Sequence, residues 1–90
     1  MVNIEFDPRK DYSNIAKHGV SLEMARELDW DAALVWVDDR FDYGECRMIA
    51  LAPGSQTLYY VAFVDIGEMQ RIISLRRATR KEVQYYVQHQ

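Results

Sequence analysis

The run TLYYVAFVD, residues 57–65, constrains the fold of this 90-residue chain more than any other segment. Successive side chains of a β-strand point to opposite faces of the sheet, so the run divides into two alternating sets. Both sets are apolar: Leu58, Tyr60, Ala62 and Val64 on one face, and Tyr59, Val61 and Phe63 on the other. A strand that is apolar on both sides is covered on both sides. We therefore expect residues 57–65 to lie in the centre of a sheet.

The N-terminal part of the chain predicts a short strand and a helix. Residues 4–6 have apolar side chains at alternate positions, as in a strand. Asp7 and Pro8 follow; Asp caps free N–H groups at a helix start, and Pro is tolerated at the first helical position. The helix is expected to run to about His18, where Gly19 ends it. Its buried side chains are expected to be Tyr12, Ile15 and Ala16.

A second helix and further strands follow. Ser21 can cap a helix that reaches about Asp29. The apolar side of this helix is formed by Leu22, Ala25 and Leu28. Short runs rich in β-branched, aromatic and other apolar residues predict strands at residues 33–37 and 46–52, and another that begins near residue 70.

The segment RIISLRRATRKE, residues 71–82, contains the end of a strand and the start of a helix. Arg71, Ile73 and Leu75 are expected on one face of the strand, and Ile72, Ser74 and Arg76 on the other. Thr79 and Glu82 fit a capping box, in which each side chain accepts from the other residue's backbone N–H. In the helix that follows, the apolar residues at helical spacing are Val83, Tyr86 and Val87.

Together these elements predict one α+β domain spanning residues 1–90. It comprises two N-terminal helices, an antiparallel sheet of about four strands and a C-terminal helix. No apolar run approaches the ~18 residues of a membrane span, and the N-terminus lacks the pattern of a signal peptide. Cys46 is the only cysteine, so no internal disulfide forms, and its place in a strand pattern favours the core. We expect a cytoplasmic protein.

Charge is distributed unevenly along the chain. Its formal net charge is -3. Residues 1–70 contain 6 Lys or Arg and 13 Asp or Glu, whereas residues 71–90 contain 5 and 1. A net acidic chain does not coat nucleic acid indiscriminately, but it can hold a focused cationic site because local potential depends on the nearest charges.

Four cations surround the junction between the last strand and the last helix: Arg76, Arg77, Arg80 and Lys81. A cation opposes the dipole at a helix N-terminus, whereas a helix N-terminus flanked by guanidinium groups suits a bound phosphate. The alternative is that these residues are solvated and paired with acids from the first half of the chain.

Several other groups are candidates for proton transfer. Lys17 and His18 end the first helix; histidine exchanges protons near neutral pH, although a cation there also stabilises the helix end. Glu45 and Arg47 are alternate residues and share a face of an extended chain. The carboxylates of the loop, Asp38, Asp39, Asp42 and Glu45, would suit a metal, but such runs are more often solvated. No glycine-rich phosphate loop, dinucleotide fingerprint or nucleophile elbow is present, and we expect no cofactor.

Three segments, in order, resemble the BrnT family of toxins from bacterial toxin–antitoxin pairs. They are FDPRKDYSNIAKHGVS (6–21), DDRFDYGECR (38–47) and RIISLRRATRKEVQYY (71–86). The first is the most specific, with its aromatic–Asp–Pro start and its Lys17-His18-Gly19-Val20 end. Phe6 stands where many members have Trp, and Leu22-Glu23 replaces the usual Phe-Glu.

The resemblance implies a RelE-like fold and a ribonuclease that needs no metal. It also implies tight inhibition by a BrnA-type antitoxin in a toxin–antitoxin heterotetramer, and repression of the shared promoter by that complex. The catalytic residues that we expect are Lys17, His18, Glu45, Arg47, Arg76, Arg77 and Tyr86. Arg47 and Arg76 are expected to stabilise charge, followed by Arg77 and Arg80. The base is His18 or Glu45, and the assisting group is Lys17 or Tyr86. Arg71, Arg80 and Lys81 are expected to contact RNA. The alternative function is a non-catalytic nucleic-acid- or protein-binding module that uses the same cations.

Overall fold

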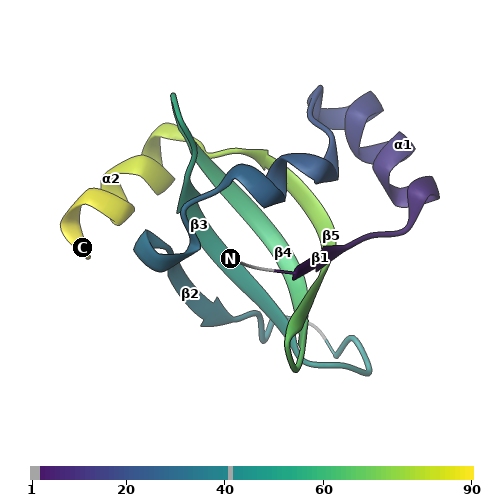
Figure 1. The fold of residues 1–90 in the computed structure, drawn as a ribbon. Helices are drawn as coiled ribbons and strands as arrows, with labels where there is room; N and C mark the ends of the chain where they lie inside the picture. Colours follow the sequence, from purple (N-terminus) through teal and green to yellow (C-terminus); the bar gives the residue numbers. More distant parts are fainter. Residues whose placement is uncertain (1–2, 41) are drawn as a thin grey trace.

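The computed structural model, which describes residues 3–40 and 42–90, has a five-stranded sheet at its centre (Figure 1). The strands lie in the order β1-β5-β4-β3-β2. Their bounds are β1 Asn3–Glu5, β2 Leu34–Val37, β3 Arg47–Pro53, β4 Leu58–Ile66 and β5 Met69–Arg77. The sequence prediction that residues 57–65 form the central strand is confirmed, because β4 has two strands on each side.

The prediction of about four antiparallel strands is wrong in two respects: the sheet has five strands, and one of them runs parallel to its neighbour. Strands β2 to β5 form an antiparallel meander, as expected. The short strand β1 joins the same sheet by pairing with β5 in parallel. Sequence periodicity identifies this strand but not its partner, since the partner lies more than sixty residues away.

The helices are α1 Pro8–His18 and α2 Arg80–Gln88, with two short 3₁₀ helices, η1 Leu22–Glu27 and η2 Trp30–Ala32. The first helix has the predicted bounds, with Asp7 as its cap and Gly19 in the left-handed conformation at its end. The second predicted helix is wrong in type. Its apolar residues Leu22, Ala25 and Leu28 recur every three positions, and a 3₁₀ helix aligns such side chains. No helix in the described ranges is long and apolar enough to cross a membrane.

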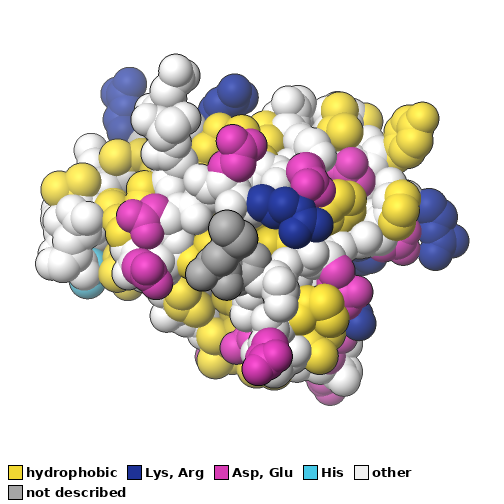
Figure 2. All heavy atoms as spheres, viewed as in Figure 1, with side chains coloured by type: hydrophobic (Ala, Val, Ile, Leu, Met, Phe, Trp, Pro, Cys, Tyr) yellow, Lys and Arg dark blue, Asp and Glu magenta, His cyan; other side chains and the backbone are white. Residues whose placement is uncertain are grey.

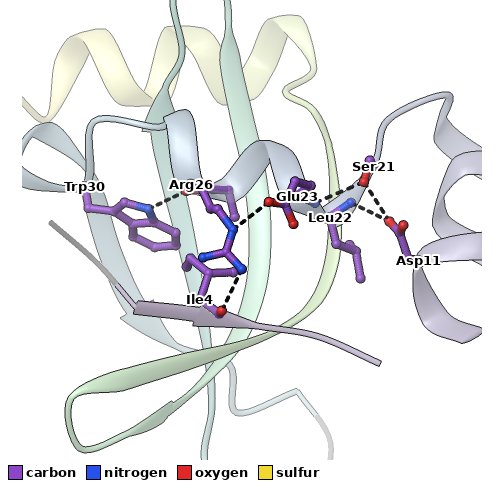
Figure 3. A network of polar contacts seen from close by, with 8 residues as sticks. Ile4, Asp11, Ser21, Leu22, Glu23, Arg26 and Trp30 are labelled. Carbon is purple, nitrogen blue, oxygen red and sulfur yellow. Dashed lines mark hydrogen bonds and ion pairs between the residues drawn. The ribbon is translucent and has the colours of Figure 1, made fainter. Parts of the chain in front are cut away.

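The 3₁₀ helices lie across one face of the sheet, which we call the covered face (Figure 1). The buried core there contains Leu22, Ala25, Val61, Ile72 and Leu75, all at or near zero exposure. Polar contacts fix η1 in place: the Asp11 carboxylate accepts from Ser21 Oγ and Leu22 N, and Arg26 donates to Glu23 and Ile4 O (Figure 3). Figure 2 shows acidic side chains scattered over this side of the molecule.

Helix α1 is attached to the edge of β5 by one buried amide. Asn14 donates to the carbonyl oxygens of Val20 and Leu75 and accepts from Leu75 N, at 2.8, 2.7 and 3.1 Å. The expectation that Tyr12, Ile15 and Ala16 are buried is wrong; Tyr12 is 83% exposed and Ile15 is 46% exposed. The helix packs through hydrogen bonds to a strand edge, so it needs no apolar stripe.

A β-bulge interrupts β5 beside the junction of Ala62 and Phe63 on β4. Ala62 pairs with Ser74 and Phe63 pairs with Ile72, so Ile73 is the extra residue. As a result Ile72 and Leu75 share the covered face, and the predicted alternation through residues 71–76 is wrong. A bulge shifts the pleat by one residue, which no regular period can predict.

The opposite face, which we call the open face, is only partly covered. Helix α2 packs on one end of it, where Tyr86 contacts a small cluster with Leu51 and Leu58. Beyond α2, three cross-strand rows follow from the register: Leu51–Tyr60–Arg76, Ile49–Ala62–Ser74 and Arg47–Val64–Arg71. The middle row has small side chains on β4 and β5 and lies between two rows that carry arginines; we call this middle row the bed of the open face.

Candidate active site

Arg76 is the most constrained cation of the open face. Its NH1 and NH2 groups donate to the two carboxylate oxygens of Glu82 at 2.8 and 2.9 Å. Its guanidinium lies 4.0 Å from the centre of the Tyr60 ring, on the neighbouring strand. The hydrogen bond to Glu82 raises the pKa of Arg76, and the same bond lowers the pKa of Glu82. Arg76 is therefore fixed on two sides while its side chain stays about one-third exposed.

Glu82 links this arginine to the start of α2. Its Oε1 accepts from Thr79 N at 2.7 Å, and its own N donates to Thr79 Oγ1 at 3.2 Å. The predicted capping box is thus confirmed. Because one carboxylate caps the helix and pairs with Arg76, the helix start holds the arginine in position.

Arg47 begins β3 in the far row of the open face. Its Nε lies 3.4 Å from Glu45 Oε2, and its guanidinium lies 4.2 Å from the centre of the Tyr43 ring. The predicted pairing of Glu45 with Arg47 is present, with the carboxylate exposed and the guanidinium half-buried. An exposed carboxylate beside a guanidinium is an arrangement that can accept a proton next to a bound phosphate.

A buried carboxylate shapes the loop between β2 and β3. Asp38 accepts from Arg40 Nε and NH2 at 2.7 and 2.9 Å and from the Tyr43 hydroxyl at 3.0 Å. These bonds, led by that from Arg40, lower the pKa of Asp38, whereas burial and then Asp38 raise the pKa of Tyr43. Asp38 also lies against β3, because its N donates to Arg47 O.

Arg40 is held by Asp38 and lies within electrostatic range of Tyr60 and Arg76 on the open face. Its pKa is raised first by the hydrogen bond with Asp38 and then by the Tyr60 phenol. Glu82 raises the pKa of Arg76, whereas the positive charge of Arg40 lowers it. Tyr60 thus lies within electrostatic range of two arginines, and the loop contributes a third cation to the site formed by β3 and β5.

The structure separates Arg77 from Arg76. Successive strand residues point to opposite faces, and Arg77 lies on the covered side in a hollow beside Tyr59, Glu23 and Glu27. Arg71 lies on the open face in the row of Arg47 and pairs with Glu5 at 3.6 Å.

The remaining predicted residues of α2 have different environments. Arg80 and Lys81 are exposed in its first turn, and Lys81 lines a hollow with Trp36, Leu51 and Tyr85. Tyr86 is 8% exposed, and its hydroxyl donates to Ala32 O at 2.6 Å. The Tyr86 hydroxyl is therefore part of the core and makes no hydrogen bond to Arg47 or Arg76 in the described ranges.

Lys17 and His18 lie at the end of α1, as predicted, and line a hollow of about 250 Å³ against β5. The lining on the β5 side is Ile73 and Ser74, and Ser74 belongs to the middle row of the open face. These two residues are therefore at the margin of the arginine rows, at the β5 edge.

No group of three or more His, Cys, Asp or Glu side chains suited to a metal ion occurs in the part of the chain that the structure describes. Of the loop carboxylates, Asp38 is engaged by Arg40 and Tyr43, and Asp42 accepts from Gly44 N. Cys46 is exposed, so its predicted core position is wrong; β3 begins one residue later.

Sequence reasoning missed three members of the site: Tyr60, Glu82 as the partner of Arg76, and Arg40. Tyr60 was assigned only to an apolar pattern, and Glu82 only to the helix cap. Two sequence patterns could have indicated these pairs. An arginine shortly before a capping box indicates the pair of Arg76 with Glu82, and an Asp-x-Arg pattern just after a strand indicates the pair of Asp38 with Arg40.

Comparison with protein families supports the function that these residues suggest. Residues 6–82 match the family described as "Ribonuclease toxin, BrnT, of type II toxin-antitoxin system". A comparison with curated proteins found no match. The matched range contains α1, the loop with Asp38 and Glu45, and the junction of Arg76 with Glu82. Because it covers most of the 90 residues, the chain belongs to the BrnT family of ribonuclease toxins of type II toxin–antitoxin systems.

Proposed function

We propose that this chain is a metal-independent endoribonuclease whose cleavage site is the bed of the open face. The observation that carries the proposal is the fixation of Arg76 between the Glu82 carboxylate and the Tyr60 ring. A guanidinium held in this way needs little reorganisation when charge develops on a phosphate. With Arg47 in the opposite row, two cations flank the bed, so charge stabilisation comes from the protein itself.

The reaction is an attack of the ribose 2′-hydroxyl on the adjacent phosphorus. A base removes the 2′-proton, the new O–P bond forms, and the bond to the 5′-oxygen breaks as an acid protonates that oxygen. The products are a 2′,3′-cyclic phosphate and a free 5′-hydroxyl. We assign charge stabilisation to Arg47 and Arg76, the base to Glu45 and the acid to His18.

The test is cleavage of single-stranded RNA by the purified chain in the presence of a chelator. Wild-type protein should produce 2′,3′-cyclic phosphate ends with the chelator present. Arg76→Ala should lower kcat by about 100-fold or more, as for the loss of one oxyanion-hole donor. Arg9→Ala is the matched control, because Arg9 is exposed and its partner Asp7 lies at the start of α1.

The outcomes separate an enzyme from a binding module. If RNA stays intact while the protein still binds it, the chain is a non-catalytic nucleic-acid-binding module. If cleavage stops when the chelator is added and returns with a divalent metal, the metal-independent mechanism is wrong. If Arg76→Ala cleaves RNA as fast as Arg9→Ala does, the role of Arg76 is wrong.

We also propose the partners of this activity. A type II toxin has an antitoxin partner and an RNA target, which the family match supports. The finer proposal is a BrnA-type antitoxin that forms a heterotetramer with a single RelE-like toxin domain in the cytoplasm, and a complex that represses its own promoter. Co-expression with the protein of the neighbouring reading frame, followed by mass measurement of the complex and promoter binding, tests each of these points.

A further inference from the structure

The hollow between α1 and the edge of β5, which we call the α1 hollow, has a purely basic and neutral lining. Its residues are Lys10, Ser13, Asn14, Lys17, His18, Ile73 and Ser74. By contrast, the hollow beneath α2 contains Glu82, the one beside β1 contains Glu5 and Asp7, and the one beside η1 contains Glu23 and Glu27. In a chain with more acids than bases, a hollow without a carboxylate favours an anionic ligand.

The two lysines of the α1 hollow differ from the arginines of the open face. Arg40, Arg47 and Arg76 are each paired with a carboxylate. Lys10 and Lys17 form no ion pair or hydrogen bond with any other residue in the described ranges. The ammonium group of Lys17 is therefore available to a ligand without breaking an internal contact, whereas Lys10 lies near Asp7 and, after the larger effect of Arg9, helps to lower the pKa of that carboxyl.

The spacing of the lysines suits an extended anion. They are seven positions apart on one helix, which is about two turns and ~10 Å along its axis, so both face the same side. Lys10 also lines the adjoining hollow, of about 340 Å³, where Arg71 lies. In that hollow Arg71 is paired with Glu5, so the cations that face a ligand along the seam between α1 and β5 are Lys10 and Lys17, and neighbouring phosphates of one chain can contact the two.

The α1 hollow is continuous with the cleavage site through Ser74. Ser74 lines the hollow and also lies in the middle row of the open face, opposite Ala62. Arg76 is two residues further along β5 on the same face, about 7 Å away by strand rise. A strand of RNA that crosses the bed between the arginine rows can therefore continue over the β5 edge into this hollow.

We propose that the α1 hollow binds the phosphodiester backbone of the RNA next to the scissile bond, with Lys10 and Lys17 as the cations. The proposal rests on the proposed function, and it moves Lys17 from catalysis to substrate binding. Apart from the His18 ring, the lining has no side chain on which a base can stack, and its two ammonium groups suit the charged phosphates of the backbone more than a particular base. Its volume is below that of most small-molecule pockets, which suits a phosphate with part of its sugar.

The test measures binding separately from cleavage. The probe is a single-stranded oligonucleotide with 2′-O-methyl groups throughout, which has the phosphates of RNA but no nucleophile. Its affinity is measured over a range of salt concentrations for wild type, Lys10→Gln, Lys17→Gln and the double variant. Arg9→Gln is the control, because it removes one positive charge from the same helix outside the hollow. Circular dichroism and thermal melting verify that each variant is folded.

Each lysine variant should weaken binding by about 5-fold at low salt, the effect of one charge pair in water. Each should also reduce the slope of log K against log salt by about 0.7, the value for one single-strand phosphate. In cleavage assays KM should rise while kcat stays within about 2-fold. Lys10→Arg and Lys17→Arg should behave like wild type, because they retain the charge.

Two results would overturn the proposal. If the double variant differs from wild type no more than Arg9→Gln does, the lysines are merely solvated. If Lys17→Gln lowers kcat while KM and probe affinity stay unchanged, Lys17 acts in the chemical step instead. If wild type binds the probe but leaves RNA uncut, the proposed function fails, and the binding comparison still decides the role of the hollow.

Discussion

Replacement of Glu82 tests whether the start of α2 supports the candidate active site. In Glu82→Ala, Arg76 loses both carboxylate contacts and Thr79 N loses its acceptor. The bidentate pair is mostly shielded, with side chains 31% and 22% exposed, so we assign it about 1–2 kcal/mol. The cap adds about 1 kcal/mol. The expected loss is therefore roughly 2–3 kcal/mol, or a fall of about 10–20 °C in Tm for a chain of this size.

The same replacement should impair cleavage well below the melting temperature. Without Glu82, the contacts of the Arg76 guanidinium that remain in the described part of the chain are the Tyr60 ring and Arg77 O. A misplacement of ~1 Å in an active site can cost about 100-fold, so we expect kcat to fall by about 10-fold or more. Urea denaturation gives the stability, and initial rates on RNA at saturating concentration give kcat.

The pH dependence of stability supplies a sharper check. The hydrogen bond from Arg76 lowers the pKa of Glu82 from its ordinary 4.5. A lowered folded-state pKa means that this contribution is fully present above about pH 4.5 and is lost as pH falls through the folded-state value. The stability difference between wild type and Glu82→Gln should therefore be constant near neutral pH and shrink under acid conditions.

Glu23→Gln is the control for Glu82, since it breaks the exposed pair with Arg26 on the other side of the sheet. It should cost less than about 1 kcal/mol and leave cleavage unchanged. The reasoning is refuted if Glu82→Ala is as stable as Glu23→Gln, or if its remaining folded protein cleaves RNA at the wild-type rate.

Four further predictions concern the scaffold. Asn14→Ala should cost about 3 kcal/mol or more in urea denaturation, because it removes three buried hydrogen bonds, two of them to Leu75; a loss below about 1 kcal/mol would contradict this. Gly54→Ala should lower the free energy of unfolding by about 1–3 kcal/mol, since the new Cβ would lie 2.8 Å from the Tyr59 ring. At Gly19 a Cβ would meet no atom within 4 Å, but φ is 71°, so Gly19→Asn should be tolerated better than Gly19→Ala. Cys46 should react with a thiol reagent in folded protein nearly as fast as in urea, and strong protection would contradict its exposure.

The parts of the fold that the sequence predicts are those governed by local chemistry. Asp7, Pro8 and Gly19 bound α1 because caps act on the nearest backbone groups. The central place of β4 follows from its two apolar faces. The parallel pairing of β1 with β5 and the bulge at Ile73 depend on contacts between distant segments, which periodicity does not contain.

The same distinction applies to the candidate site. Arg47 with Glu45, and the cap formed by Thr79 with Glu82, are close in sequence and were predicted as pairs. The Tyr60 ring under Arg76 is sixteen residues away and depends on the register of β4 with β5. Arg77 was grouped with Arg76, yet the strand pleat sends neighbouring side chains to opposite faces.

The pairing of the arginines explains how an acidic chain can hold a focused cationic site. Arg40, Arg47 and Arg76 each have a carboxylate partner, so the open face presents oriented guanidinium groups with little net charge. Such groups recognise phosphate by geometry, whereas long-range attraction requires uncompensated charge. Lys10 and Lys17 supply that charge at the edge of the same face in our proposal. Salt should therefore weaken RNA capture strongly and affect kcat at saturating RNA much less, and an equal effect of salt on both would contradict this division of roles.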